Sequence, residues 1–186
     1  VQFTGDGEKT VNEMYAILEG HNVIFSAIVA YLRTTNTNLA SQQLPGVLFE
    51  SLIKLVKKLR DENIQVTEKW AAYMALRGGV IQHENDIAKP TDDFNDLAGV
   101  LTAMKTIYKT QLGRLHNIAF ISALTDSDGH LLHFVNINLV YNQKKLYQMV
   151  KAMQIQLRTT GAIGDYIFSN ALDVEDIEQD IFDFSN

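Results

Sequence analysis

The sequence predicts an all-α protein, a bundle of four long helices followed by a short fifth one. Apolar residues recur at helical spacing over four segments of roughly 25–30 residues each. Only two prolines, Pro45 and Pro90, and 11 glycines occur in the 186 residues, so long stretches run without a helix breaker. Helices of this length measure about 40 Å and are typical of four-helix bundles.

The first two helices are expected at roughly 11–32 and 46–77, where apolar residues fall on one helical face. A polar stretch, 34–43, follows the first of them. The tripeptide Arg77-Gly78-Gly79 ends the second helix, because glycine readily takes the left-handed conformation that follows a helix C-terminus.

The third helix is expected at roughly 93–124, with N-cap chemistry from Thr-Asp-Asp at 91–93. A turn at 126–129 leads to the fourth helix, roughly 130–159, and a short fifth element covers 163–170. The connection between the second and third helices is the longest of the three. A long crossover there lets these two helices run parallel.

The net charge of −6 resides in a C-terminal tail. Without the six acids of that tail, 22 − 6 = 16 acidic residues face 16 basic ones. We therefore expect a neutral body, 1–172, and an acidic tail, 173–186. The tail carboxylates belong to Asp173, Glu175, Asp176, Glu178, Asp180 and Asp183.

Composition also excludes several classes of function. The absence of cysteine excludes disulfide scaffolds, thiolate zinc sites and cysteine nucleophiles. A neutral body with an acidic tail argues against a nucleic-acid partner, which would require a basic patch. No uninterrupted apolar run approaches the ~18 residues that span a bilayer, so we expect no membrane partner.

Four stretches of the chain resemble ferritins. Residues 75–81 and 86–94 resemble the end of that family's second helix and its crossing loop. Residues 128–134 resemble the start of its fourth helix, and 157–168 the end of that helix and the short fifth one. Residues 54–62 are similar to the light-chain subunits of insect secreted ferritins.

This resemblance implies a shell of 24 subunits that stores a ferric mineral, with no tightly bound cofactor. A heavy-chain-type ferritin subunit is the implied partner. The implied compartment is the secretory pathway, with the cytoplasm as the alternative. The chain begins with Val1, which agrees with removal of an N-terminal segment.

The oxidising subunits of ferritins need a di-iron site of Glu residues and a Glu-x-x-His pair. This sequence contains no Glu-x-x-His pair. The resemblance places the remnant of that site at Ile24, Tyr31, Glu62, Asn63, Val66, Tyr108 and Gln143. Glu62 is the one carboxylate and the one candidate metal ligand among them. We therefore expect no ferroxidase activity, and a hydrogen-bonded polar patch of Tyr31, Glu62, Asn63, Tyr108 and Gln143 inside the bundle.

Two further sites implied by the resemblance are altered. Carboxylates of the threefold entry channel are replaced by His133 and Asn136, and His130 lies on the same helical face as His133. The alternative for these histidines is a partly exposed polar face near a helix N-terminus. The cavity face of the second helix has become half basic, with Lys54, Lys57, Lys58, Asp61, Glu62, Gln65 and Glu68. Its alternative is a solvated face with pairs such as Lys57–Asp61.

Three functions follow from these residues. The first is a non-catalytic, light-chain-type subunit that stores iron by co-assembly with active subunits. The second is a ferritin-fold shell that has lost iron chemistry and serves as a structural, carrier or storage protein. The third, a di-metal oxidase, requires the missing Glu-x-x-His pair. In a shell, the tail carboxylates could replace those lost from the cavity face.

Overall fold

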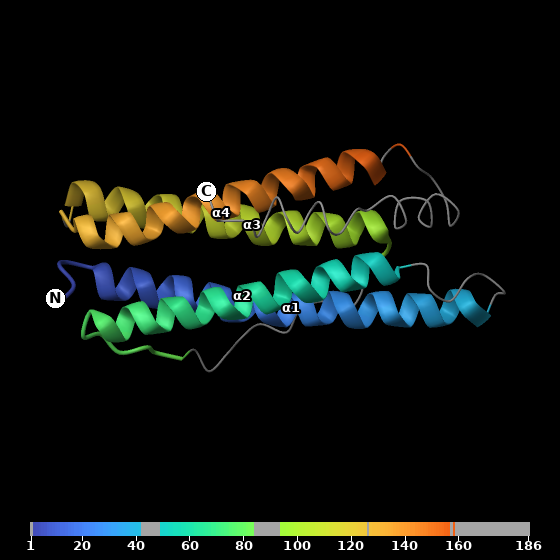
Figure 1. Cartoon of the computed structure of the whole chain (residues 1–186), viewed down its shortest axis with the longest axis horizontal. Coiled ribbons are helices and arrows are strands. Elements are labelled where there is room, and N and C mark those ends of the chain that lie inside the picture. Colours follow the sequence, from blue (N-terminus) through green and yellow to red (C-terminus); the bar gives the residue numbers. More distant parts are fainter. Residues whose placement is uncertain (1, 42–48, 84–93, 126, 157, 159–186) are drawn as a thin grey trace.

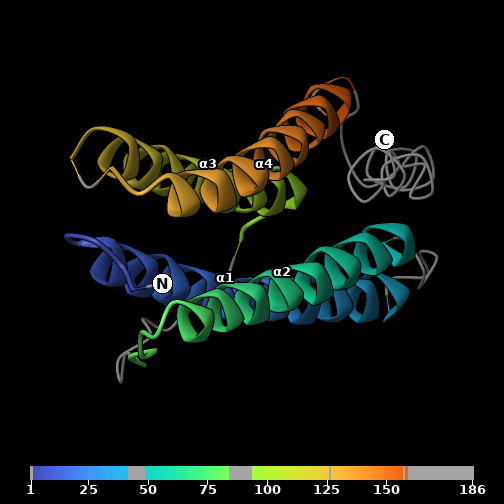
Figure 2. The same ribbon diagram turned by 60° about the vertical axis from the view of Figure 1, so that its left-hand side comes forward.

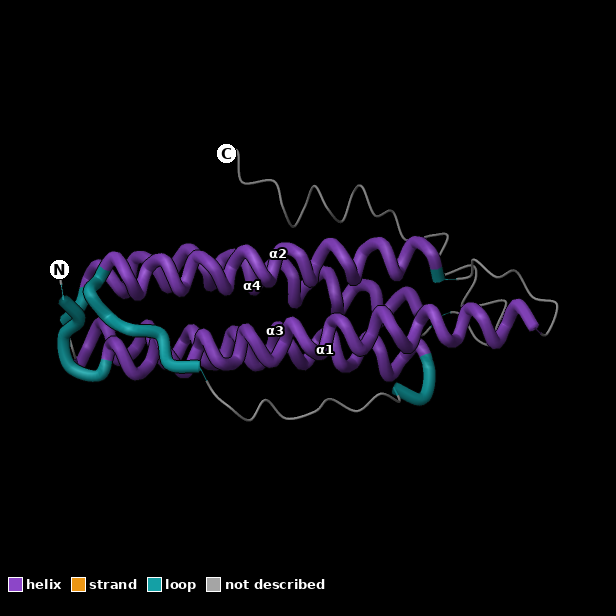
Figure 3. The backbone as a smooth tube through the Cα atoms, turned by 90° about the horizontal axis from the view of Figure 1, so that it is seen from below, coloured by secondary structure: helices purple, strands orange, loops and turns teal. Residues whose placement is uncertain are grey.

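The computed structural model describes residues 2–41, 49–83, 94–125, 127–156 and 158. Within these ranges the chain is helical and contains no strand (Figure 3). The elements are α1 (Gly7–Ser41), α2 (Glu50–Leu76), α3 (Leu97–Phe120), the π-helical turn η1 (Ile121–Thr125) and α4 (Gly129–Gln156). The predicted all-α class is confirmed.

The helices form two antiparallel pairs that lie one above the other, α1 with α2 and α3 with α4 (Figures 1 and 2). α2 and α3 both begin at the end of the bundle where α4 ends, so they run in the same direction (Figure 1). The connection between them therefore returns along the length of the bundle. Half of it, 84–93, lies outside the described residues, as do the predicted fifth helix and the acidic tail.

α1 continues to Ser41, into the polar stretch that we expected to follow it. Thr34, Thr35 and Thr37 each donate a hydroxyl hydrogen bond to the carbonyl oxygen four residues earlier, at 2.9–3.1 Å. Such bonds satisfy the hydroxyl within the helix and let threonines continue it. The side chain of Asn36 then accepts from the Phe49 amide at 3.1 Å, which fixes the start of α2 against α1. The prediction that the helix ends near residue 32 was wrong.

The N-cap of α3 also lies later than predicted. Asp96, in an extended conformation, accepts a hydrogen bond from the Gly99 amide at 2.8 Å. A Cβ at Gly99 would lie 1.8 Å from the Phe94 carbonyl oxygen, so only glycine fits this turn. At the C-terminus of α2 the prediction is confirmed, because Gly78 has φ of 76°.

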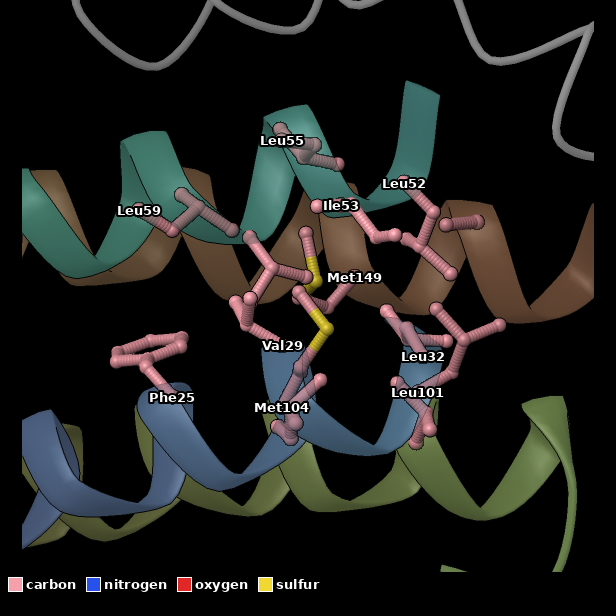
Figure 4. Packing of buried hydrophobic residues seen from close by; sticks show 14 of the residues in the cluster. Phe25, Val29, Leu32, Leu52, Ile53, Leu55, Leu59, Leu101, Met104 and Met149 are labelled. Atoms are coloured by element: carbon pink, nitrogen blue, oxygen red, sulfur yellow. The ribbon is translucent and has the colours of Figure 1, made fainter. Parts of the chain in front are cut away.

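The bundle interior holds two apolar clusters, each containing side chains from all four helices. Apolar cluster I lies toward the start of α2 and apolar cluster II toward its end. Burial of these side chains is the main stabilising contribution to the bundle. Cluster I includes Phe25, Val29, Leu59, Met104 and Met149 (Figure 4), and cluster II includes Leu18, Trp70, Leu115, Leu131 and Val135.

A buried ion pair closes the end of the bundle where α2 stops and α4 starts. Arg77 donates to Asp128 through both of its terminal nitrogens, at 2.7 and 3.3 Å, and to the Tyr73 hydroxyl at 2.6 Å. Asp128 also accepts from the Leu131 amide at 3.0 Å and so caps α4. Burial tends to raise the pKa of Asp128, but the bonds from Arg77 and from this amide hold that pKa below its ordinary value.

One described helix, Gly7–Asn38, is long and apolar enough to cross a membrane by length and composition. We did not anticipate this, because polar residues interrupt its apolar ones. A core helix of a soluble bundle passes the same test, and 39% of this apolar window is buried inside the structure. The absence of a membrane partner stays a prediction.

Candidate functional site

A layer of polar side chains separates the two apolar clusters at the middle of the bundle. Every helix contributes to it at a position between its cluster I and cluster II residues. We call these residues the central polar cluster: His21 and Asn22 from α1, Asn63 and Thr67 from α2, Gln111 from α3 and Asn142 from α4. All except Asn22 are less than 9% exposed.

The amides of this cluster form one directed chain of hydrogen bonds. Asn142 donates to Gln111 Oε1 at 3.1 Å. Gln111 Nε2 donates to Asn63 Oδ1 at 3.0 Å and to His21 Nδ1 at 2.9 Å. Asn63 Nδ2 then donates to Asn22 Oδ1 at 2.6 Å and to a main-chain carbonyl of α1 at 3.1 Å. The amide oxygens of Gln111, Asn63 and Asn22 thus each already accept a hydrogen bond.

His21 is held neutral within this cluster. Burial lowers its pKa from 6.5 to about 4, because a buried imidazolium would lose its hydration. The bond from Gln111 makes Nδ1 the acceptor, so the proton of the neutral ring is on Nε2. Any metal that used Nδ1 would have to break this bond.

A buried ion pair lies beside the central polar cluster. The Lys145 ammonium of α4 contacts the Glu62 carboxylate of α2, and the two side chains are 2% and 13% exposed. Burial lowers the pKa of Lys145, while the Glu62 carboxylate opposes this shift. The ammonium also lies 5.6 Å from the Tyr108 ring centre and 5.7 Å from that of Tyr141, within cation–π range.

The Tyr108 hydroxyl completes this group. It is fully buried, and no described group forms a hydrogen bond with it. Burial and the nearby Glu62 carboxylate raise the pKa of Tyr108 well above its ordinary value, so the phenol stays protonated. An uncharged phenol is a poor ligand for a hard cation compared with a carboxylate.

The side chains that meet here stabilise the bundle and do not form a set of metal ligands. No three His, Cys, Asp or Glu side chains gather anywhere in the described part of the chain. Glu62, the one carboxylate at the site, is neutralised by the chain's own ammonium. The amide oxygens of Gln111 and Asn63 and the Nδ1 atom of His21 already accept hydrogen bonds from neighbouring side-chain amides. Two iron ions would need several free carboxylates.

The structure separates the residues that the resemblance grouped together. Asn63 lies in a hydrogen-bonded polar cluster, as we expected. Gln143, expected in the interior, is exposed on α4, where its neighbour Asn142 points inward. Tyr31 packs its ring 5.4 Å from that of Phe94, away from the central polar cluster.

The two apolar positions of the predicted remnant lie in the core. Ile24 is partly buried against apolar cluster I, and Val66 against apolar cluster II. Neither can offer a ligand atom. The remnant set therefore provides one carboxylate, Glu62, and that carboxylate pairs with Lys145 rather than with the other predicted residues.

The predicted channel residues lie along the first turns of α4. His130, His133 and Asn136 are exposed. His130 stacks on Tyr73 with ring centres 5.5 Å apart, and its Nδ1 is hydrogen-bonded to the Tyr73 hydroxyl at 3.0 Å. This agrees with the alternative of an exposed polar face near a helix N-terminus.

The predicted cavity face is on the outside of α2. Lys54, Lys58, Asp61, Gln65 and Glu68 are exposed, and Lys57 is half-buried. Asp61 lies 3.6 Å from its neighbour Arg60, a weak exposed pair. Glu62 of the same set turns inward to Lys145.

The sequence reasoning missed His21, Gln111, Asn142 and Lys145. A signal for them existed, because each is a polar residue at a position where the helical period requires an apolar one. Gln111 comes three residues after Tyr108, and His21 comes three residues before Ile24. Each therefore lies about one helical turn from the residue that the resemblance selected. The burial of these side chains and their hydrogen bonds, rather than the resemblance, identify them as part of the site.

Comparison of the sequence with models of protein families gives no match, and comparison with curated proteins gives no significant match. The resemblance to ferritins therefore stays a prediction.

Proposed function

We propose that the chain is a non-catalytic, light-chain-type subunit of a ferritin-like shell, which stores a ferric mineral by co-assembly with ferroxidase-active subunits. The observation that carries the non-catalytic part is the pairing of Glu62 with Lys145. A tethered ammonium beside the one available carboxylate opposes binding of a second cation by charge repulsion. The bundle of long helices with parallel α2 and α3 is compatible with the subunit fold.

Assembly is supported by exposed apolar side chains at one end of the bundle. Leu76, the last residue of α2, and Val80, just beyond it, are 70% and 69% exposed. Phe120, the last residue of α3, and Leu124, in η1, are 61% and 69% exposed. Large apolar side chains left in water at this level favour a protein interface.

The test combines sizing with iron loading. The purified chain, alone and mixed with a ferroxidase-active ferritin subunit, is sized by light scattering and then given Fe(II) in air. We expect a large shell, slow oxygen uptake by the chain alone, and a soluble mineral in the mixture. Fast oxygen uptake by the chain alone would overturn the non-catalytic assignment, and a monomer in both samples would overturn the shell.

The second candidate is a ferritin-fold shell without iron chemistry, acting as a structural, carrier or storage protein. The observation that favours it is the exposure of Lys54 and Lys58 on the predicted cavity face, since lysines there would repel iron. In the same experiment, this function predicts a shell that forms no mineral even when mixed with the active subunit.

A further inference from the structure

A groove of about 300 Å³ lies between α2 and α4. Its volume is at the lower end of the range found for small-molecule pockets. Its apolar wall is formed by Val66, Phe134 and Ile137, and its polar lining includes Glu62, Lys69 and Tyr141. One groove thus offers both an apolar surface and charged groups, as sites for amphipathic ligands do.

The groove has a net positive charge once the pairing of Glu62 with Lys145 is taken into account. Glu62 is neutralised by Lys145, which lies behind it. Lys69 is exposed and forms no ion pair with any described residue. Its ammonium is close enough to the Lys145 ammonium to help lower the pKa of Lys145. One uncompensated positive charge therefore remains at the groove and favours an anion.

The apolar wall is suited to a ring or a short chain. Phe134 is held rigidly, because its ring stacks on Tyr73 at 4.0 Å and meets Trp70 edge-on at 4.9 Å. Ile137 is 48% exposed, so a ligand could cover apolar surface that water now contacts. A fixed aromatic surface costs little entropy to use in binding.

We propose that the groove between α2 and α4 binds a small amphipathic organic anion, with its ring or short chain against Phe134 and Ile137 and its anionic group on Lys69. The groove lies within one chain, so its binding does not depend on shell assembly or on iron. The ligand class is one aromatic ring system or short alkyl chain that bears a carboxylate, sulfonate or phosphate.

The test uses the full chain and its single tryptophan. Trp70 contacts the groove wall through Phe134, so a fluorescent ligand in the groove accepts energy from it. The probe is 8-anilinonaphthalene-1-sulfonate, titrated with excitation of the tryptophan. We expect Lys69→Gln to weaken binding by about fivefold, the effect of an exposed charge contact. The control Lys109→Gln, at an exposed lysine of α3, should change it less than about twofold.

Two further measurements keep the outcome decisive. Ile137→Asn, at a half-exposed position that should leave the fold intact, should also weaken binding. The uncharged N-phenyl-1-naphthylamine should bind more weakly than the sulfonate probe to the wild-type chain, and equally to the wild-type chain and Lys69→Gln. Absence of binding, equal affinity in Lys69→Gln, or an equal loss in Lys109→Gln would overturn the proposal. Sizing and iron loading are unaffected by any of these outcomes, so the proposed function stands or falls separately.

Discussion

Acid should destabilise this protein through His21. The folded state keeps the imidazole neutral down to a pKa of about 4, whereas an unfolded histidine binds a proton below its ordinary pKa of 6.5. Between these values the unfolded state binds more protons, so the free energy of unfolding decreases as the pH falls. A difference of about 2.5 pKa units at 1.36 kcal/mol each gives a loss of about 3 kcal/mol, complete near pH 4.

The assay is urea unfolding at several pH values, followed by far-ultraviolet circular dichroism. His21→Gln should remove most of this decrease between pH 6.5 and 4, because glutamine keeps an acceptor for Gln111 but binds no proton. His133→Gln, at an exposed histidine of α4, is the matched control and should retain it. If His21→Gln lost stability with falling pH as steeply as the wild-type chain, the assignment of a neutral buried His21 would be refuted.

Three other predictions concern buried polar groups and use the same unfolding assay near pH 7. Lys145→Met should cost about 3–5 kcal/mol by leaving Glu62 unpaired, whereas Lys145→Met with Glu62→Leu should be nearly neutral; an equal cost in both variants would contradict this. Asp128→Ala should also cost about 3–5 kcal/mol, because Arg77 loses its buried partner, and a loss below about 1 kcal/mol would show that the pair contributes little. Tyr108→Phe should leave stability unchanged or raise it by about 1 kcal/mol, since the hydroxyl has no described partner; a marked loss would reveal one.

The helical class was predictable from the sequence because the apolar period persists over each helix. The helix boundaries were less predictable where side chains form hydrogen bonds with the main chain. Thr34 and Thr37 continue α1 through a polar stretch by bonding back to its carbonyls. Asp96 caps α3, whereas the sequence predicts the cap at residues 91–93. Both outcomes depend on local hydrogen bonds that propensity does not contain.

The candidate site was less predictable than the fold, for a related reason. A resemblance compares positions along the chain. A layer inside a bundle instead consists of the residues of the four helices that lie at the same level along the bundle axis. An error of one residue moves a side chain by about 100° around its helix, which is enough to exchange buried Asn142 for exposed Gln143. An error of three residues changes the height by a turn and exchanges Gln111 for Tyr108.

The central polar cluster also explains how the described helices stay well ordered around a polar layer. A layer of unsatisfied amides between two apolar clusters would be costly, and a layer of apolar residues would specify the helix register less well. Here the amide oxygens of Gln111 and Asn63 accept hydrogen bonds, and the buried ammonium of Lys145 has a carboxylate partner in Glu62. All four helices are thereby fixed at one height without any cation from outside. Described polar side chains that satisfy one another in this way leave the bundle with no structural need for a cation at this layer.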